Sequence, residues 1–232
     1  MKKIASAEAR FVEASDQSLI VYFGEKTSPE AHESVRGLAH LLDAEPIPGL
    51  RNVHPGYASV LVKFDGVAFT HSQIEKILKE YFARTDKVNL PPPRQVEIPV
   101  CYNAEFGPDL EGVAMAHNLA KERVIELHSA LAYHVYCLGF VPGFAYLGDL
   151  PVELVTPRLP TPRRTVPAGS VGIAGNQTGV YPFATPGGWR LLGRTPLKMF
   201  QADRPELSLL AIGDHVKFVP VSREKFAQLE RG

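Results

Sequence analysis

The stretch 138–200 decides the fold of this chain: LGFVPGFAYLGDLP (138–151) and, after a short spacer, TPRLPTPRRTVPAGSVGIAGNQTGVYPFATPGGWRLLGRTPLKMF (156–200). These 63 residues hold 10 of the 19 glycines and 9 of the 20 prolines. Aromatic and branched apolar side chains lie between them, and they supply far more apolar surface than a disordered tract has. The stretch is therefore predicted to be folded.

Short runs within this stretch have the composition of β-strands: Ser170–Ala174, Gly179–Phe183 and Trp189–Gly193. Pro-Gly, Gly-Gly and Gly-Asn pairs separate them, as in the tight loops of a compact barrel or sandwich. The stretch also carries six basic and only two acidic residues. Loops that present arginines on a rigid sheet are a usual place for binding and chemistry.

Working outward, the length of 232 residues allows one large or two small domains. The 25 basic and 25 acidic residues balance, so the chain lacks the positive excess of a nucleic-acid binder or a membrane-surface protein. Small molecules or proteins are the expected partners.

Cys101 and Cys137 are the only cysteines, too few for a disulfide framework or a four-cysteine zinc site, and they indicate a reducing compartment. Cys137 is interpreted as a small buried hydrophobe, with a thiol nucleophile as the alternative. The sequence shows no signal-peptide pattern and no apolar run near ~18 residues. A cytoplasmic location is expected.

The first part of the chain, residues 1–88, is predicted to be a small α+β domain. Its elements follow the order ββαββα, which can form a four-stranded antiparallel sheet with two helices on one face, a ferredoxin-like arrangement. The expected elements are strands at Ala9–Glu13, Ser18–Phe23, Ile47–Val53 and Tyr57–Phe64, a helix from Ser28-Pro29 to Leu42, and a helix from His71 to Phe82.

Pro91, Pro92 and Pro93 form a stiff segment that cannot continue a helix, so a domain boundary is placed there and a second domain at 89–232. A strand at Gln95–Cys101 opens that domain. Two predicted helices within 110–129 look superficially like a helix-turn-helix, but a net charge of −2 between residues 107 and 129 argues against contact with DNA phosphates. Two helices over one end of a barrel are preferred.

Common nucleotide and metal motifs are missing from the sequence. The run of glycines at 172, 175 and 179 lacks the lysine of a phosphate loop. The histidines do not pair at metal-ligand spacing, and the closest candidates, His128 and His134, lie six residues apart without a nearby Cys or carboxylate. No metal site is predicted.

Six residues remain as candidates for a functional site, each with a structural alternative. His128 is either a core or capping histidine or a general acid/base. Arg158 and Arg163 lie in proline-framed loops, where preorganised guanidinium groups suit a carboxylate or phosphate, unless they are simply solvated. Gln177, Thr178 and Tyr181 follow glycines that either let polar groups converge on a ligand or merely form a hairpin turn.

Taken together, LGFxPGFxYLGxLP, the Pro-Arg pairs, VPAGSVGIxGxQTGVYPxATPGGWxLxGxT and the late GDxVxFVP closely resemble the allophanate hydrolase subunit 1 family. That family includes the B-type subunit of 5-oxoprolinase, the Kip-type inhibitor of a sporulation histidine kinase and a segment of urea carboxylase. The resemblance is dense over 139–195 and collinear, though thinner, from about residue 95 to residue 220. It implies a small α+β domain followed by a cyclophilin-like β-barrel.

The resemblance also implies a function. It indicates one member of a heteromeric complex, working with homologues of the C-type and A-type subunits of 5-oxoprolinase in the ATP-dependent cleavage of 5-oxoproline to glutamate, with ATP and Mg²⁺ as cofactors. In that scheme His128 and Arg163 are catalytic, and Arg158, Gln177, Thr178 and Tyr181 bind the substrate. The alternatives are a Kip-type regulator that binds a histidine kinase and a carboxyl-transfer subunit that acts on urea or an amide.

Overall fold

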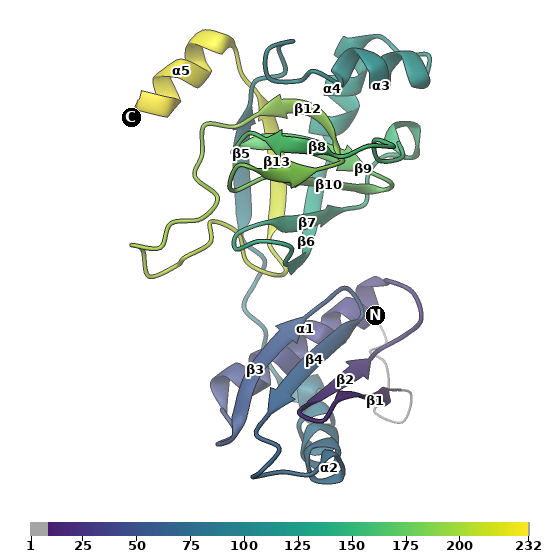
Figure 1. Ribbon diagram of the computed structural model, residues 1–232, viewed down its shortest axis with the longest axis vertical. Helices are drawn as coiled ribbons and strands as arrows, with labels where there is room; N and C mark the ends of the chain where they lie inside the picture. Colours follow the sequence, from purple (N-terminus) through teal and green to yellow (C-terminus); the bar gives the residue numbers. More distant parts are fainter. Residues whose placement is uncertain (1–8, 232) are drawn as a thin grey trace. The chain divides into compact units, whose positions relative to one another are not determined.

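The computed structural model describes residues 9–231, and the chain divides into two compact units, Met1–Pro92 and Pro93–Gly232. Both units combine helices with β-sheet (Figure 1), so the predicted α+β class is confirmed. The division falls within the proline-rich segment. That each unit is a separately folding domain, divided at residues 88 and 89, stays a prediction.

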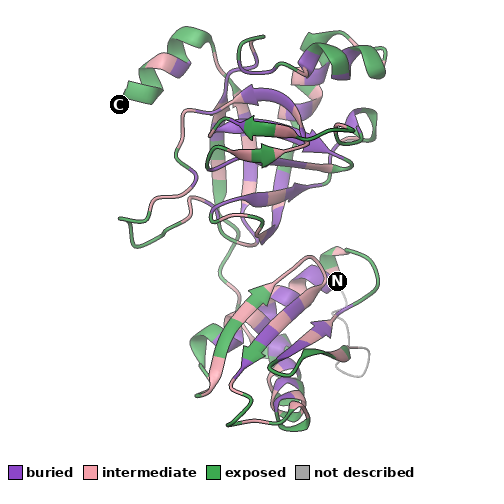
Figure 2. Cartoon of the chain, in the orientation of Figure 1, coloured by how far each residue is buried: buried purple, intermediate pink, exposed green. Residues whose placement is uncertain are grey.

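The first unit has the predicted element order ββαββα. Its strands form one antiparallel sheet in the order β1-β2-β4-β3, and both helices pack into a single apolar core against it. Figure 2 shows the buried residues of β2, β4 and the two helices, whereas β1 and β3 at the sheet edges are exposed or half-buried. The elements are β1 (Arg10–Ser15), β2 (Ser18–Tyr22), α1 (Pro29–Ala44), β3 (Leu50–Pro55), β4 (Ser59–Phe64) and α2 (His71–Phe82), followed by the 3₁₀ turn η2 (Thr85–Lys87).

Both helices of this unit begin at side-chain caps, and the sequence predicts the one at Ser28. The Ser28 hydroxyl accepts a hydrogen bond from the Ala31 N–H at 3.1 Å, and Thr70 and Gln73 form a reciprocal capping box. The prediction of a strand at Ile47–Val53 is wrong at its start. The Leu50 N–H donates to the Ile47 carbonyl, and Gly49 has a φ of 96°, so a turn precedes β3.

The second unit is built on a seven-stranded, barrel-like sheet in the order β12-β9-β10-β7-β6-β13-β5. Backbone hydrogen bonds between Cys101 and Arg194, of 2.9 and 3.0 Å, link its two edges and nearly close it. Gly193 permits this approach, because a Cβ there would lie 2.7 Å from the Cys101 carbonyl oxygen. The strands are β5 (Gln95–Val100), β6 (Ala132–Leu138), β7 (Ala145–Gly148), β9 (Ser170–Ala174), β10 (Gln177–Val180), β12 (Arg190–Arg194) and β13 (His215–Pro220).

The predicted strand at Gly179–Phe183 is misplaced. Gly175, with a φ of 57°, lets β10 begin at Gln177, and Pro182 ends the pairing because it has no N–H to donate. A two-stranded ribbon of β8 (Arg163–Val166) and β11 (Thr185–Gly187), together with β7, was not predicted. These strands are only three or four residues long, too short for a pattern of alternating side chains to be recognised.

Helices cover parts of this sheet. Figure 1 shows α3 (Leu110–Ala116) and α4 (Lys121–Ala130) together at one end of the barrel, as the sequence predicts. The remaining elements are the 3₁₀ turn η3 (Val152–Leu154) and the terminal helix α5 (Arg223–Arg231). The cyclophilin-like topology predicted for this barrel stays a prediction.

Trypsin tests the division of the chain. Lys87 is exposed and directly precedes the extended proline-rich segment, so we expect cleavage after Lys87 before any other site in the two units, leaving two fragments that resist further digestion. Mass spectrometry of the early products checks this. Early cuts inside either unit, with residues 88–94 still intact, would contradict the prediction that the two units fold independently.

Candidate functional site

A cluster of aromatic rings lies on the outer face of the barrel sheet, beneath the β8–β11 ribbon. Phe144 is at its centre, with ring centroids of Tyr146, Tyr181 and Trp189 at 4.9, 5.3 and 5.3 Å, all in edge-to-face contact. Gly179 of β10 leaves room for the rings, because a Cβ at this position would lie only 3.2 Å from the indole of Trp189. The rings therefore lie directly on the sheet.

A small cavity of about 240 Å³ opens above this cluster; we call it the Arg158 pocket. Glycines and prolines form part of its lining, and Arg158 is its single charged side chain. The aromatic residues that line it are Phe140, Phe144, Tyr146, Tyr181 and Trp189.

The backbone on both sides of Arg158 is fixed. The Arg190 Nε donates to the Pro157 carbonyl at 3.3 Å, and the Leu159 N–H donates to the Gly188 carbonyl at 2.7 Å. Among the residues that the structure describes, none forms a hydrogen bond or an ion pair with the Arg158 guanidinium. The pocket thus presents an anchored cation whose hydrogen-bond donors are available to an anion.

Two tyrosine hydroxyls share the electrostatic environment of this guanidinium. Burial raises the pKa of Tyr146, and the nearby Arg158 charge opposes that shift. Burial likewise raises the pKa of Tyr181, opposed by a hydrogen bond with the Trp189 backbone and by the Arg158 charge. Both hydroxyls are therefore protonated at neutral pH and can donate a hydrogen bond.

Arg163 lies behind the wall of the pocket and is held by protein groups. Its guanidinium donates to the Asp109 carboxylate at 2.7 Å and to the Trp189 carbonyl at 3.2 Å. The other Asp109 oxygen accepts from the Leu191 N–H at 2.6 Å. Asp109 therefore does not cap α3 with its side chain. This geometry supports a positioning role for Arg163, whereas the predicted catalytic role stays a prediction.

His128 and Thr178 meet in the barrel core, not in the pocket. Both are 0% exposed, and the His128 Nε2 lies 2.8 Å from the Thr178 hydroxyl. That hydroxyl donates to the Gly172 carbonyl at 3.1 Å, so it accepts from Nε2–H, and Nδ1 accepts from the Tyr102 hydroxyl at 2.8 Å. The ring stacks on Phe218 with a centroid distance of 4.6 Å. Every polar atom of the imidazole is thus satisfied by protein.

Burial lowers the pKa of His128 to about 3. The histidine is therefore neutral at physiological pH, and these contacts support a structural role; its predicted role in proton transfer stays a prediction. The side-chain alternation of β10 separates the two neighbours, because Thr178 faces the barrel core and Gln177 faces the other way. Gln177 is half-buried at the start of β10 and does not line the Arg158 pocket.

Of the six predicted site residues, the structure brings Arg158 and Tyr181 together in one pocket. The sequence did not identify Phe140, Phe144 and Tyr146 as pocket residues, although all three belong to the GFVPGFAY motif. Nor did it identify Asp109 as the partner of Arg163, because 54 residues separate them. The pairing of Asp109 with Arg163 is seen only in the folded structure.

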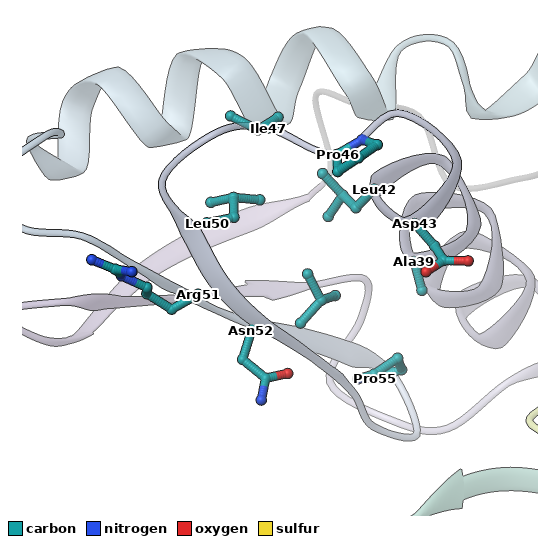
Figure 3. A pocket seen from close by; sticks show the side chains of 10 residues that line it. Ala39, Leu42, Asp43, Pro46, Ile47, Leu50, Arg51, Asn52 and Pro55 are labelled. Atoms are coloured by element: carbon teal, nitrogen blue, oxygen red, sulfur yellow. The ribbon is translucent and has the colours of Figure 1, made fainter. Parts of the chain in front are cut away.

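A second cavity, of about 440 Å³, lies in the first unit between α1 and β3 (Figure 3). Leu42, Ile47 and Leu50 line its apolar wall. Arg51 also lines it, and its guanidinium donates to the Asp65 carboxylate at 2.5 Å. Its guanidinium is thus already paired. None of the predicted site residues lines this open groove, so the Arg158 pocket is the better candidate.

Other kinds of site have less support. Burial raises the pKa of the Cys137 thiol to about 12, which leaves a negligible thiolate fraction at neutral pH. Within residues 9–231, no three His, Cys, Asp or Glu side chains are grouped so that they could hold a metal ion. In the same range, every helix is too short or too polar to cross a bilayer.

Comparison with known proteins places this architecture in a class. Residues 9–210 match the family described as carboxyltransferase domain, subdomain C and D. The chain is 40% identical over 221 residues to the B-type subunit of 5-oxoprolinase from Bacillus subtilis (strain 168), an alignment that covers 91% of this chain and 92% of that protein. The chain belongs to the family of this B-type 5-oxoprolinase subunit, as the resemblance in its sequence indicated.

Two further relatives are larger proteins. The crystal structure of TTHA0988 superposes with a TM-score of 0.79 and 38% identity, covering 89% of this chain and 40% of that one. Urea amidolyase of Saccharomyces cerevisiae is 25% identical in an alignment 259 positions long, which covers 97% of this chain but only 14% of that enzyme. This chain thus corresponds to one segment of each.

The buried histidine makes a testable contribution to stability. The folded chain holds His128 neutral down to a pKa of about 3, whereas the unfolded chain takes up a proton near pH 6.5, so stability is lost as pH falls below that value. Between pH 7.5 and 5 we expect this group to lower the free energy of unfolding by about 2 kcal/mol. A His128→Gln variant lacks this titration.

Urea unfolding of both proteins at several pH values measures the difference. The stability gap between the wild type and His128→Gln should shrink by that amount on acidification. If the free energies of unfolding of the two proteins changed in parallel with pH, His128 would take up a proton in the folded chain as well, which would contradict the prediction.

Proposed function

We propose that this chain is the B-type subunit of an ATP-dependent 5-oxoprolinase complex, and that the Arg158 pocket holds the carboxylate of the substrate. The observation that carries the proposal is the anchored, unpaired Arg158 guanidinium at an aromatic pocket in a member of the B-type 5-oxoprolinase family. A bidentate guanidinium–carboxylate contact is a strong, orienting interaction.

The pocket suits a small cyclic acid. Arg158 binds the carboxylate, the protonated Tyr181 hydroxyl donates to its oxygens or to the amide carbonyl, and the aromatic rings cover the apolar ring atoms. With a volume of about 240 Å³, the pocket lies below the roughly 300–1,000 Å³ of sites for drug-sized ligands. A small metabolite fits that size.

The same pocket does not fit ATP and Mg²⁺. It is too small for a nucleoside triphosphate, and no carboxylate among its described lining residues is available to a magnesium ion. We therefore derive no step through the nucleotide in this chain. The proposal assigns ATP binding to the assembled complex with homologues of the A-type and C-type subunits, and leaves to this chain the binding and orientation of the substrate.

The carboxyl-transfer alternative has support from the description of the matching family and from the distant urea amidolyase relative. Urea, however, is uncharged and would leave the Arg158 guanidinium without an anionic partner in the pocket. The charge of the pocket therefore favours an acidic substrate.

Reconstitution tests the proposal. The chain is co-expressed with homologues of the A-type and C-type subunits, and ATP-dependent release of glutamate from 5-oxoproline is measured. We expect turnover only when this chain is present. Arg158→Lys keeps the charge but loses the bidentate geometry, so kcat/KM should fall ~30–150-fold, while the free energy of unfolding should stay within about 0.5 kcal/mol.

Arg163→Lys is the matched control. Because Arg163 bonds Asp109 and the Trp189 carbonyl, this variant should lose roughly 1–2 kcal/mol of stability. A normal kcat/KM for Arg158→Lys in the active complex would remove Arg158 from the site. Full turnover by the complex without this chain would remove the chain from the reaction.

A further inference from the structure

The loop between β6 and β7 holds Phe140 in an unusual backbone conformation. Its φ is 68°, and the Val141 N–H donates to the Gly139 carbonyl at 2.9 Å across it. Residues 139–141 therefore form a γ-turn with a positive central φ, a rare and strained form. An aromatic residue persists there only where the surrounding structure imposes the conformation.

The surrounding loop supplies that constraint. The Phe144 N–H donates to the Val141 carbonyl at 3.1 Å, with Pro142 and Gly143 (φ 79°) at the two central positions, as in a type II turn. Gly143 also packs tightly against Phe200, whose Cβ would lie 2.7 Å from a Cβ at position 143. The two turns and this contact fix the direction of the Phe140 side chain.

The fixed direction brings the Phe140 ring to the Arg158 pocket. The ring contacts Phe144 edge to face at 5.6 Å and lines the cavity, yet the residue is 60% exposed. A single exposed aromatic side chain is ordinary on a protein surface. An exposed ring that is held in a strained turn at a pocket beside an unpaired guanidinium is not ordinary, because the backbone strain costs free energy.

We propose that Phe140 is a specificity-determining residue of the Arg158 pocket. Its ring covers the apolar ring of a small cyclic carboxylate whose carboxylate group binds Arg158, so that the pocket selects cyclic acids over acyclic ones. This inference rests on the proposed function of the pocket. The Phe140 contact depends on the shape of the ligand, whereas the Arg158 contact depends on its charge.

Competitive inhibitors separate the two contacts. Cyclopentanecarboxylate carries a ring and a carboxylate, and acetate carries the carboxylate alone; both are assayed against 5-oxoproline turnover by the reconstituted complex. For Phe140→Ala we expect the KM for 5-oxoproline and the inhibition constant of cyclopentanecarboxylate to rise about tenfold, the factor for one lost aromatic contact. The inhibition constant of acetate should stay within twofold.

Two further variants complete the design. Phe140→Gly removes the ring and also relieves the positive φ, so its melting temperature should equal or exceed that of the wild type and lie above that of Phe140→Ala. Arg158→Lys should weaken both inhibitors, because both carry the carboxylate.

The outcomes are distinguishable. Unchanged constants for Phe140→Ala, with both inhibitors weakened by Arg158→Lys, would overturn the role of Phe140 and leave the proposed function standing. Equal weakening of both inhibitors by Phe140→Ala and Phe140→Gly, with a lower melting temperature for both, would show a structural residue. Weaker assembly of the complex with Phe140→Ala, and unchanged inhibitor constants in the complex that does form, would place Phe140 in an interface instead. Unchanged constants in Arg158→Lys would overturn the pocket and the inference together.

Discussion

The Asp109 carboxylate joins three segments that lie far apart in the sequence. One oxygen accepts from Arg163 in the β8–β11 ribbon, and the other accepts from the Leu191 backbone in β12. Hydrogen bonds to a charged group contribute about 1.5–3 kcal/mol each, roughly twice the contribution of neutral ones. Arg163 in turn binds the Trp189 carbonyl, so this carboxylate fixes the backbone beneath the aromatic cluster. Without it, Arg163 and the Leu191 N–H would lose their shared partner behind the wall of the Arg158 pocket.

Glycine and proline make the rest of that wall possible. Gly179 leaves room for the indole of Trp189 on the outer face of the sheet, and Gly143 allows the β6–β7 loop to pack on Phe200.

Arg158 and Arg163 have different surroundings although they lie five residues apart. Arg163 is paired with the Asp109 carboxylate and the Trp189 carbonyl, whereas the Arg158 guanidinium has no hydrogen-bond partner among the described residues and its backbone is anchored. A pocket that keeps one cation unpaired is suited to an anionic ligand.

The sequence predicts local features of this fold better than distant contacts. The helix cap at Ser28, the ββαββα order and strand Ser170–Ala174 follow from short-range chemistry and are confirmed. The strands of the β8–β11 ribbon, of four and three residues, are too short to show a period-two pattern. Arg158 and Tyr181 were placed among the site residues from their loop context. The burial of His128 and the pairing of Arg163 with Asp109 depend on residues 50 and 54 positions away, which no local pattern contains.

The central claim is that the Arg158 pocket holds the substrate. Trp189 lines that pocket and is the only tryptophan in the chain, so a chain labelled with 5-fluorotryptophan gives one ¹⁹F resonance even within a complex of unlabelled partners. Titration of the complex with 5-oxoproline should shift this resonance saturably, and 2-pyrrolidinone, which has the lactam ring but no carboxylate, should shift it at least tenfold less effectively. A resonance that does not move while the same sample converts 5-oxoproline to glutamate would contradict the account.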